Sequence, residues 1–249
     1  MLWDELAQDW GRYAAPICPD SADLAHFRAG ISGADDHVLL LGVTPLLAGL
    51  GRKLTSVDTC RSMIDLVWPG DNETRRAVQG NWLFDLAHAA GFTAAITDGG
   101  LSVLRWPDQY VMLFASLRAA GAPQCRLIAR CHFSANVQPT PDLAVLRAEL
   151  RSGLRPDPDL VRFRVAHALV AASGEPNIAV RETVRVAAEL LHDQPEARAS
   201  LLARPHAHCD ESYSFPNPVQ LIELIEDCGF WVDHAGLRSH DPFVHCTVQ

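Results

Sequence analysis

The chain has 249 residues, a formal net charge of −9, and contents of 48% hydrophobic and 20% charged residues. These values are typical of a globular protein, and the length accommodates one sizeable α/β domain with an added segment. The acidic balance and the dispersed arginines argue against a large nucleic-acid-binding surface, which needs clustered basic side chains.

No apolar run approaches the roughly 18 residues of a membrane span, and the N-terminus lacks the pattern of a signal peptide. The seven cysteines include no CxxC pair, and several lie in apolar contexts. We therefore expect a cytoplasmic protein with reduced thiols, and we expect neither a membrane nor a nucleic acid as its partner.

Two short helices are predicted at the N-terminus. Apolar and aromatic residues recur at partly helical spacing over 2–14, and Pro16 and Pro19 end this segment. Asp20 then begins a second helix that extends to about residue 29. We expect the aromatic side chains of the first helix to pack this helix against the sheet.

A buried strand followed by a tight turn is predicted over 38–45. Four apolar residues lead into Gly42, whose missing side chain lets a ligand approach the backbone. Thr44 and Pro45 suit the first positions of a helix. The next predicted strand, 53–57, ends at Asp58, where a carboxylate can accept hydrogen bonds from a ribose diol. An ordinary strand–helix–strand unit with a solvated aspartate is the alternative.

Further alternating elements predict an open parallel sheet. Predicted helices cover 60–67 and 107–119, and predicted strands cover 74–78, 92–97 and 125–131. The fourth strand ends in Asp98 and Gly99, and the fifth carries Arg130 and His132 toward the same edge. Ligands bind at the carboxyl edge of such sheets.

Residues 139–205 depart from this alternation, because apolar residues recur at helical spacing between prolines. Three or four inserted helices are predicted, either as a substrate lid or as a dimer surface. The following stretch, 205–211, contains histidine, cysteine and aspartate, but it lacks the ligand spacing of a zinc site, so we predict a polar loop that enters the site and no metal. A last helix is predicted over 217–228, and strands over 230–235 and 243–248.

Six short motifs occur in an order that resembles one enzyme family. They are Leu-Leu-Gly-Val-Thr-Pro-Leu-Leu-Ala (40–48), Ser-Val-Asp (56–58), Ser-Met-Ile (62–64), Trp-Pro-Gly (68–70), Gly-Asn-Trp-Leu (80–83) and Thr-Asp-Gly-Gly-Leu-Ser-Val-Leu (97–104). The chain resembles class I S-adenosylmethionine-dependent methyltransferases, in a bacterial subgroup with a GVTPxLA first loop. The resemblance covers about 35–133. It implies an α/β Rossmann-like methyltransferase fold, with a seven-stranded, mostly parallel sheet, helices on both faces and a helical insertion.

The resemblance also implies a division of the chain into a helical cover (1–34), a cofactor-binding core (35–138), a helical lid (139–209) and a C-terminal part of the core (210–249). The cofactor-binding residues that it implies are Gly42, Val43, Thr44, Asp58, Thr59, Met63, Asn81, Trp82, Asp98 and Gly99. Asn81 and Trp82 are suited to adenine by hydrogen bonding and stacking, although a helix cap and a core residue are the alternatives.

The implied function is methyl transfer from S-adenosylmethionine to a small-molecule acceptor by in-line displacement. Candidates for a general base are His132, His206 and Tyr213, and candidates for acceptor binding are Tyr13, Arg130 and His208. The acidic chain slightly favours a neutral or cationic acceptor. A non-catalytic cofactor-binding sensor or partner subunit and a nicotinamide-dependent oxidoreductase remain the alternatives, and a homodimer through 139–205 stays open.

Overall fold

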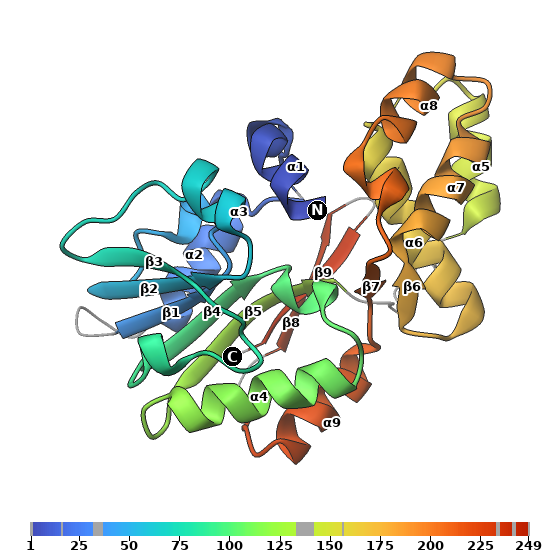
Figure 1. The fold of residues 1–249 in the computed structure, drawn as a ribbon. Coiled ribbons are helices and arrows are strands. Elements are labelled where there is room, and N and C mark those ends of the chain that lie inside the picture. The colour runs from blue at the N-terminus through green and yellow to red at the C-terminus, as the bar shows by residue number, and fades with distance from the viewer. Residues whose placement is uncertain are drawn as a thin grey trace.

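The computed structural model describes residues 2–15, 17–31, 37–132, 142–155, 157–232, 235–240 and 243–248, the last two ranges by their backbone alone. A seven-stranded sheet with the strand order β3-β2-β1-β4-β5-β9-β8 forms the centre (Figure 1). Its strands are β1 (His37–Leu41), β2 (Lys53–Asp58), β3 (Arg75–Gln79), β4 (Ala94–Asp98), β5 (Arg126–His132), β8 (Ala235–His240) and β9 (Phe243–Val248). The five strands from β3 to β5 are parallel, whereas β9 is antiparallel to both β5 and β8. This parallel core confirms the predicted Rossmann-like α/β class.

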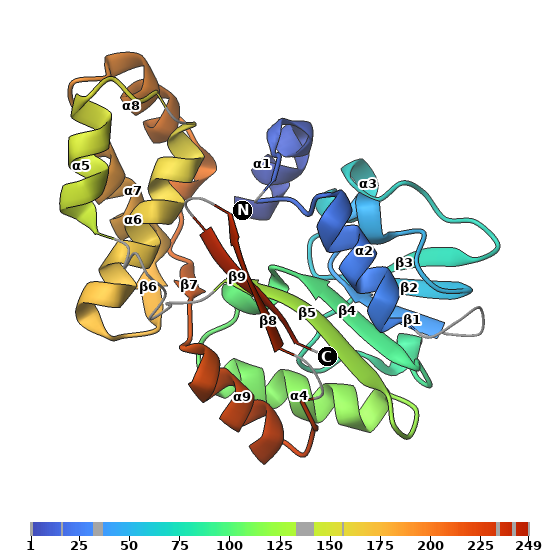
Figure 2. The same cartoon turned by 180° about the vertical axis from the view of Figure 1, so that it is seen from behind.

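Successive side chains of β1 enter opposite hydrophobic cores, as the two-residue period of a strand requires. Leu39 and Leu41 pack with α4 (Asp108–Ala120) and α9 (Pro218–Asp227). Val38 and Leu40 pack with residues of α1 (Leu2–Asp9), α2 (Ser21–Gly30) and α3 (Arg61–Leu66). Burial on both faces explains why β1 is an unbroken apolar run, and Figure 2 shows helices on both sides of the sheet.

The predicted N-terminal helices are confirmed. The second helix begins at a capping box, in which the Asp20 side chain accepts from the backbone N–H of Asp23 and the Asp23 side chain accepts from that of Asp20. The first helix lies on α3, where Ser62 Oγ donates to Asp4 Oδ1 at 2.6 Å. A short 3-10 helix, η1 (Trp10–Arg12), continues α1.

The predicted insertion forms a helical bundle beside the sheet (Figure 1). The helices of the bundle are α5 (Leu143–Arg151), α6 (Pro158–Ser173), α7 (Val180–Leu190) and α8 (Pro195–Leu202). They share a hydrophobic core of their own, which explains their helical apolar spacing. Two three-residue strands, β6 (Asn177–Ala179) and β7 (Ser212–Ser214), pair antiparallel next to the bundle. They were not predicted, because three residues are too short for an alternating pattern to be recognised.

Three local predictions are wrong. After Gly42 the chain forms only the 3-10 helix η2 (Pro45–Leu47), and Thr44 makes no capping hydrogen bond. The predicted polar loop at the start of 205–211 is the 3-10 helix η5 (Pro205–His208). The strand predicted over 230–235 lies instead at Ala235–His240. The apolar residues Phe230 and Val232, which suggested a strand, pack against the hydrophobic core that contains residues of α4 and α9.

Candidate functional site

The turn after β1 brings three of the predicted cofactor residues together. Gly42 has a φ of 100°, a conformation that favours glycine, and its N–H donates to the Val57 carbonyl at 2.9 Å. The Trp82 indole N–H donates to the same carbonyl at 2.6 Å. A Cβ added at Gly42 would lie 3.8 Å from Trp82 Cζ2 and 4.0 Å from Asp58 Oδ2. The bare backbone, the indole and the carboxylate therefore meet at the carboxyl edge of β1 and β2.

Asp58 ends β2 as predicted. Its Oδ1 accepts a hydrogen bond from the backbone N–H of Cys60 at 2.8 Å, which fixes the orientation of the carboxylate. Burial raises the pKa of Asp58 to about 6, although that hydrogen bond opposes the shift. A partly desolvated carboxylate beside a glycine can accept hydrogen bonds from two ligand hydroxyls.

The other residues predicted around the cofactor differ in how far they are exposed to solvent. Val43, Thr44 and Met63 are buried, whereas Thr59 and Asn81 are exposed. The Asn81 side-chain oxygen accepts from the backbone N–H of Leu83 at 2.9 Å, as in an Asx turn. Asn81 thus stabilises a turn and does not cap a helix, which was the predicted alternative, and its contact with adenine stays a prediction.

Asp98 and Arg130 form an ion pair between the carboxyl ends of β4 and β5. Arg130 Nε donates to Asp98 Oδ1, its Nη1 lies 3.9 Å from Asp23 Oδ2, and its Nη2 donates to the Ile17 carbonyl at 3.1 Å. Arg130 is 1% exposed. Burial disfavours its charge, but Asp98 and Asp23 hold the pKa of the guanidinium above its usual value. This network joins the sheet edge to the N-terminal segment, and an acceptor contact by Arg130 stays a prediction.

His132, at the end of β5, faces both β4 and the helical bundle. A Cβ added at Gly99, which has a φ of 67°, would lie 3.7 Å from His132 Nε2. The His132 ring centroid is 5.8 Å from that of Phe163, 6.4 Å from that of His167 and 6.5 Å from that of Phe215. Sequence reasoning missed these three neighbours. The sequence pattern that could have indicated two of them is the four-residue spacing of Phe163 and His167, which places both on one helix face.

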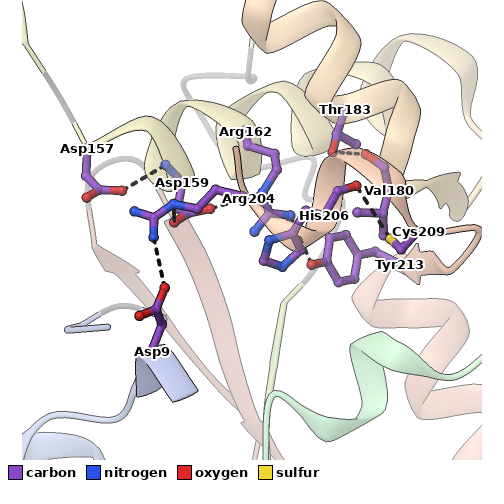
Figure 3. Close-up of polar contacts among 10 residues, drawn as sticks. All are labelled: Asp9, Asp157, Asp159, Arg162, Val180, Thr183, Arg204, His206, Cys209 and Tyr213. Carbon is purple, nitrogen blue, oxygen red and sulfur yellow. Dashed lines mark hydrogen bonds and ion pairs between the residues drawn. The ribbon is translucent and has the colours of Figure 1, made fainter. Parts of the chain in front are cut away.

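A second group of side chains lies where the bundle meets η5 (Figure 3). Tyr213 Oη accepts from Arg162 Nη1 at 2.9 Å, and the rings of Tyr213 and Phe163 are stacked. Burial, reinforced by Arg162 and Arg204, lowers the pKa of the His206 imidazole to about 2, so it is neutral. His206 and Tyr213 are thus brought together, through Arg162.

Tyr13 approaches the same group from the N-terminal segment. Burial and the nearby charge of Asp159 raise the pKa of its hydroxyl to about 12, although Arg204 and Arg162 oppose the shift. His208, in contrast, is exposed at the end of η5. Tyr13 was predicted at the site, whereas Asp159, Arg162 and Arg204 were not, because nothing in a helical repeat marks which charged residues face inward.

Within the part of the chain that the structure describes, no group of three or more histidine, cysteine, aspartate or glutamate side chains is arranged to hold a metal ion. No described helix is both long enough and apolar enough to cross a membrane.

No protein-family model matches the chain, and no curated protein matches it. Solved structures, in contrast, do match the chain. A Methanosarcina mazei protein described as a SAM-dependent methyltransferase is 16% identical, with a TM-score of 0.57 over 93% of this chain and 96% of that one. The DhpI–SAH complex is 15% identical, with a TM-score of 0.57 over 99% and 92%. Burkholderia thailandensis 1,6-didemethyltoxoflavin-N1-methyltransferase, with its substrate and S-adenosylhomocysteine bound, is 17% identical, with a TM-score of 0.53 over 97% and 80%.

A structure described as a putative zinc-dependent alcohol dehydrogenase from Rhodobacter sphaeroides has the same TM-score of 0.57, at 12% identity. At such identities the likeness concerns the fold alone. The chain has the Rossmann-like fold of class I SAM-dependent methyltransferases, with a parallel central sheet of five strands and packed helices.

Proposed function

We propose that the protein transfers a methyl group from S-adenosylmethionine to a small-molecule acceptor by in-line displacement. The observation that carries this proposal is the approach of the Asp58 carboxylate to the bare backbone of Gly42, at the sheet edge where ligands of this fold bind. Neighbouring structures support it, because several of them hold SAH or SAM, and one of these also holds 1,6-didemethyltoxoflavin.

In this proposal Asp58 binds the ribose diol, and Asn81 and Trp82 contact the adenine. Asp98 and Gly99 lie near the amino-acid moiety of the cofactor. Further residues complete the cofactor site, namely Val43, Thr44, Thr59 and Met63. The close fit of the Trp82 ring against Gly42 and Gly100 supports a fixed indole, since a Cβ added at Gly100 would lie 3.2 Å from Trp82 Cη2.

Positioning of the acceptor supplies much of the acceleration, and a base is needed only if the acceptor atom must lose a proton. Of the three candidates, we assign this role to His132, which lies beside Gly99. A neutral His206 with a pKa of about 2 is a weak base. Burial raises the pKa of Tyr213 above its usual value, so this phenol keeps its proton at neutral pH and is suited to orient the acceptor.

The helical bundle acts as a lid in this proposal. Its support is a hydrophobic cluster that joins Phe163 and Tyr213 to Val103, which follows β4, and to Ile17 of the N-terminal segment. The proposed units are the cover (1–34), the core (35–138), the lid (139–209) and the C-terminal part of the core (210–249). We place the chain in the GVTPxLA subgroup and in the cytoplasm. Tyr13, Arg130 and His208 remain proposed acceptor contacts, and a homodimer through the bundle is the competing arrangement.

A thermal-shift panel with S-adenosylmethionine, S-adenosylhomocysteine, NAD and NADP tests the cofactor. At about 100 times its Kd a ligand stabilises the native state by about 2.7 kcal/mol. For a chain of this length the melting temperature is expected to rise by roughly 5–10 °C with the two sulfur ligands and to stay unchanged with the dinucleotides. A shift with NAD or NADP alone would contradict the proposal and favour the oxidoreductase. Release of S-adenosylhomocysteine in an acceptor screen then separates an enzyme from a cofactor-binding sensor.

A further inference from the structure

Two arginines share one buried carboxylate at the junction of the helical bundle and η5. Asp159 Oδ1 lies 3.4 Å from Arg162 Nε, and Asp159 Oδ2 lies 3.5 Å from Arg204 Nε (Figure 3). The side chains of Arg162 and Asp159 are 1% and 2% exposed, and that of Arg204 is 11% exposed. The buried part of this group therefore carries two positive charges and one negative charge.

Among the residues that the structure describes, the surrounding side chains do not offset this excess. Asp9 lies 3.8 Å from Arg204 Nη1, but its carboxylate is 43% exposed and pairs at 2.8 Å with Arg12. His206 is neutral, so it adds no charge of either sign. A buried cation without a full partner is costly, and a bound anion is the simplest partner.

A second observation also points to a ligand. His206 is 3% exposed, and its Nδ1 has no hydrogen-bond partner among the residues that the structure describes. Buried polar atoms of this kind are uncommon and call for an explanation. The Tyr213 hydroxyl, which accepts from Arg162, has its own proton to donate. Imidazole, phenol and guanidinium groups thus converge from η5, β7 and α6.

The group lies near the proposed site of methyl transfer. The Phe163 ring centroid is 4.7 Å from Arg162 Cζ and 5.8 Å from the His132 ring centroid. One aromatic ring therefore separates Arg162 from His132, which lies next to Gly99 at the end of β4.

We propose that the acceptor carries an oxyanion, a carboxylate or phosphonate type of group, which binds to Arg162 and Arg204 while its nucleophilic atom lies beside His132. This inference rests on the proposed function, because it names the substrate class of the same site. It also reverses the expectation of a neutral or cationic acceptor, since the net charge of the whole chain does not describe the charge of one buried group.

Isothermal titration calorimetry of the protein saturated with S-adenosylhomocysteine tests this inference. The probes are benzoate and phenylphosphonate, each compared with neutral benzamide. Because hydrogen bonds to charged groups are the stronger ones, we expect at least one of the two anions to bind about tenfold or more tightly than the amide. The anion that shows the larger preference distinguishes a carboxylate from a phosphonate acceptor.

Arg204→Gln removes the excess charge and leaves Asp159 paired with Arg162, so this variant is expected to fold and to lose the preference for the anion. Arg181→Gln is the matched control, because Arg181 lies on α7, is 68% exposed and forms a surface ion pair with Asp210. It should retain the preference. Both variants should bind S-adenosylhomocysteine as the wild type does.

Binding of S-adenosylhomocysteine without any preference for the anions would overturn the inference and leave the proposed function standing. Weaker binding of S-adenosylhomocysteine by Arg204→Gln would also overturn it, because the arginines would then serve the carboxylate of the cofactor. A protein that binds no S-adenosylhomocysteine at all contradicts the proposed function, and the inference with it.

Discussion

Replacement of Asp58 by alanine is expected to weaken the binding of S-adenosylhomocysteine by more than tenfold. The carboxylate is the acceptor that we assign to the ribose diol, and hydrogen bonds to a charged group are each worth about 1.5–3 kcal/mol. The fold should survive, because the side chain makes only one described hydrogen bond, to the N–H of Cys60. Calorimetric titration measures the affinity, and circular dichroism checks the fold. An unchanged affinity in a folded variant would refute the assignment.

The raised pKa of Asp58 leads to a separate prediction for Asp58→Asn. Between its ordinary pKa and about 6, the native state holds the proton more tightly than the unfolded state does, so this group lowers stability as the pH rises through that window. The neutral amide avoids this loss. We therefore expect the ligand-free variant to be more stable than the wild type above pH 7, by at most about 3 kcal/mol, and the difference to vanish below about pH 3.

Denaturant unfolding at both pH values measures this difference, and calorimetry follows the affinity for S-adenosylhomocysteine. The wild type is expected to lose affinity as the pH falls through about 6, where the carboxylate is protonated, whereas Asp58→Asn should bind weakly at every pH. A variant that is less stable than the wild type above pH 7 would show that burial does not control this carboxyl group.

Arg130→Met is expected to lower the free energy of unfolding by about 3–5 kcal/mol. The substitution leaves the carboxylates of Asp98 and Asp23 buried without their cation, and breaking a buried ion pair on one side carries this cost. It also removes the hydrogen bond to the Ile17 carbonyl, which ties the N-terminal segment to β5. Urea unfolding measures the change.

Arg76→Met serves as the control, because Arg76 lies on β3, is exposed and bonds only to the carbonyl of His88 among the described residues; its effect should stay within about 0.5 kcal/mol. The double variant Arg130→Met, Asp98→Asn should recover part of the loss, since it removes both charges of the pair. A loss for Arg130→Met no larger than that of the control would mean that the network contributes little to folding.

Much of the sheet was predictable from sequence, because burial on both faces makes the strands apolar runs. This holds for β1, β4 and β5, whose ends were predicted to within a few residues. The second N-terminal helix was predictable from its cap at Asp20. The short strands β6 and β7 were not, since their pairing depends on contacts between segments that are far apart in the sequence.

In the candidate site, too, some features were predictable from the sequence and others were not. Gly42 and Asp58 were predictable, because a strand end fixes where the next side chain lies. The approach of Phe163 to His132 was not, since it depends on how the helical bundle docks on the sheet. The ion pairs of both Arg162 and Arg204 with Asp159 were not predictable for the same reason.

The first helix belongs energetically to the sheet rather than to the helical bundle. Its Ala7 and Trp3 join the apolar core on the α3 face, and Asp4 bonds to Ser62 of that helix. Its links toward the bundle include two polar ones, the ion pair of Asp9 with Arg204 and the hydrogen bond between Trp3 and Glu211. Water replaces polar links far more readily than it replaces apolar contacts. If the bundle swings outward, we therefore expect these polar contacts of α1 to separate first, and Tyr13 to remain with α1 beside the entering acceptor.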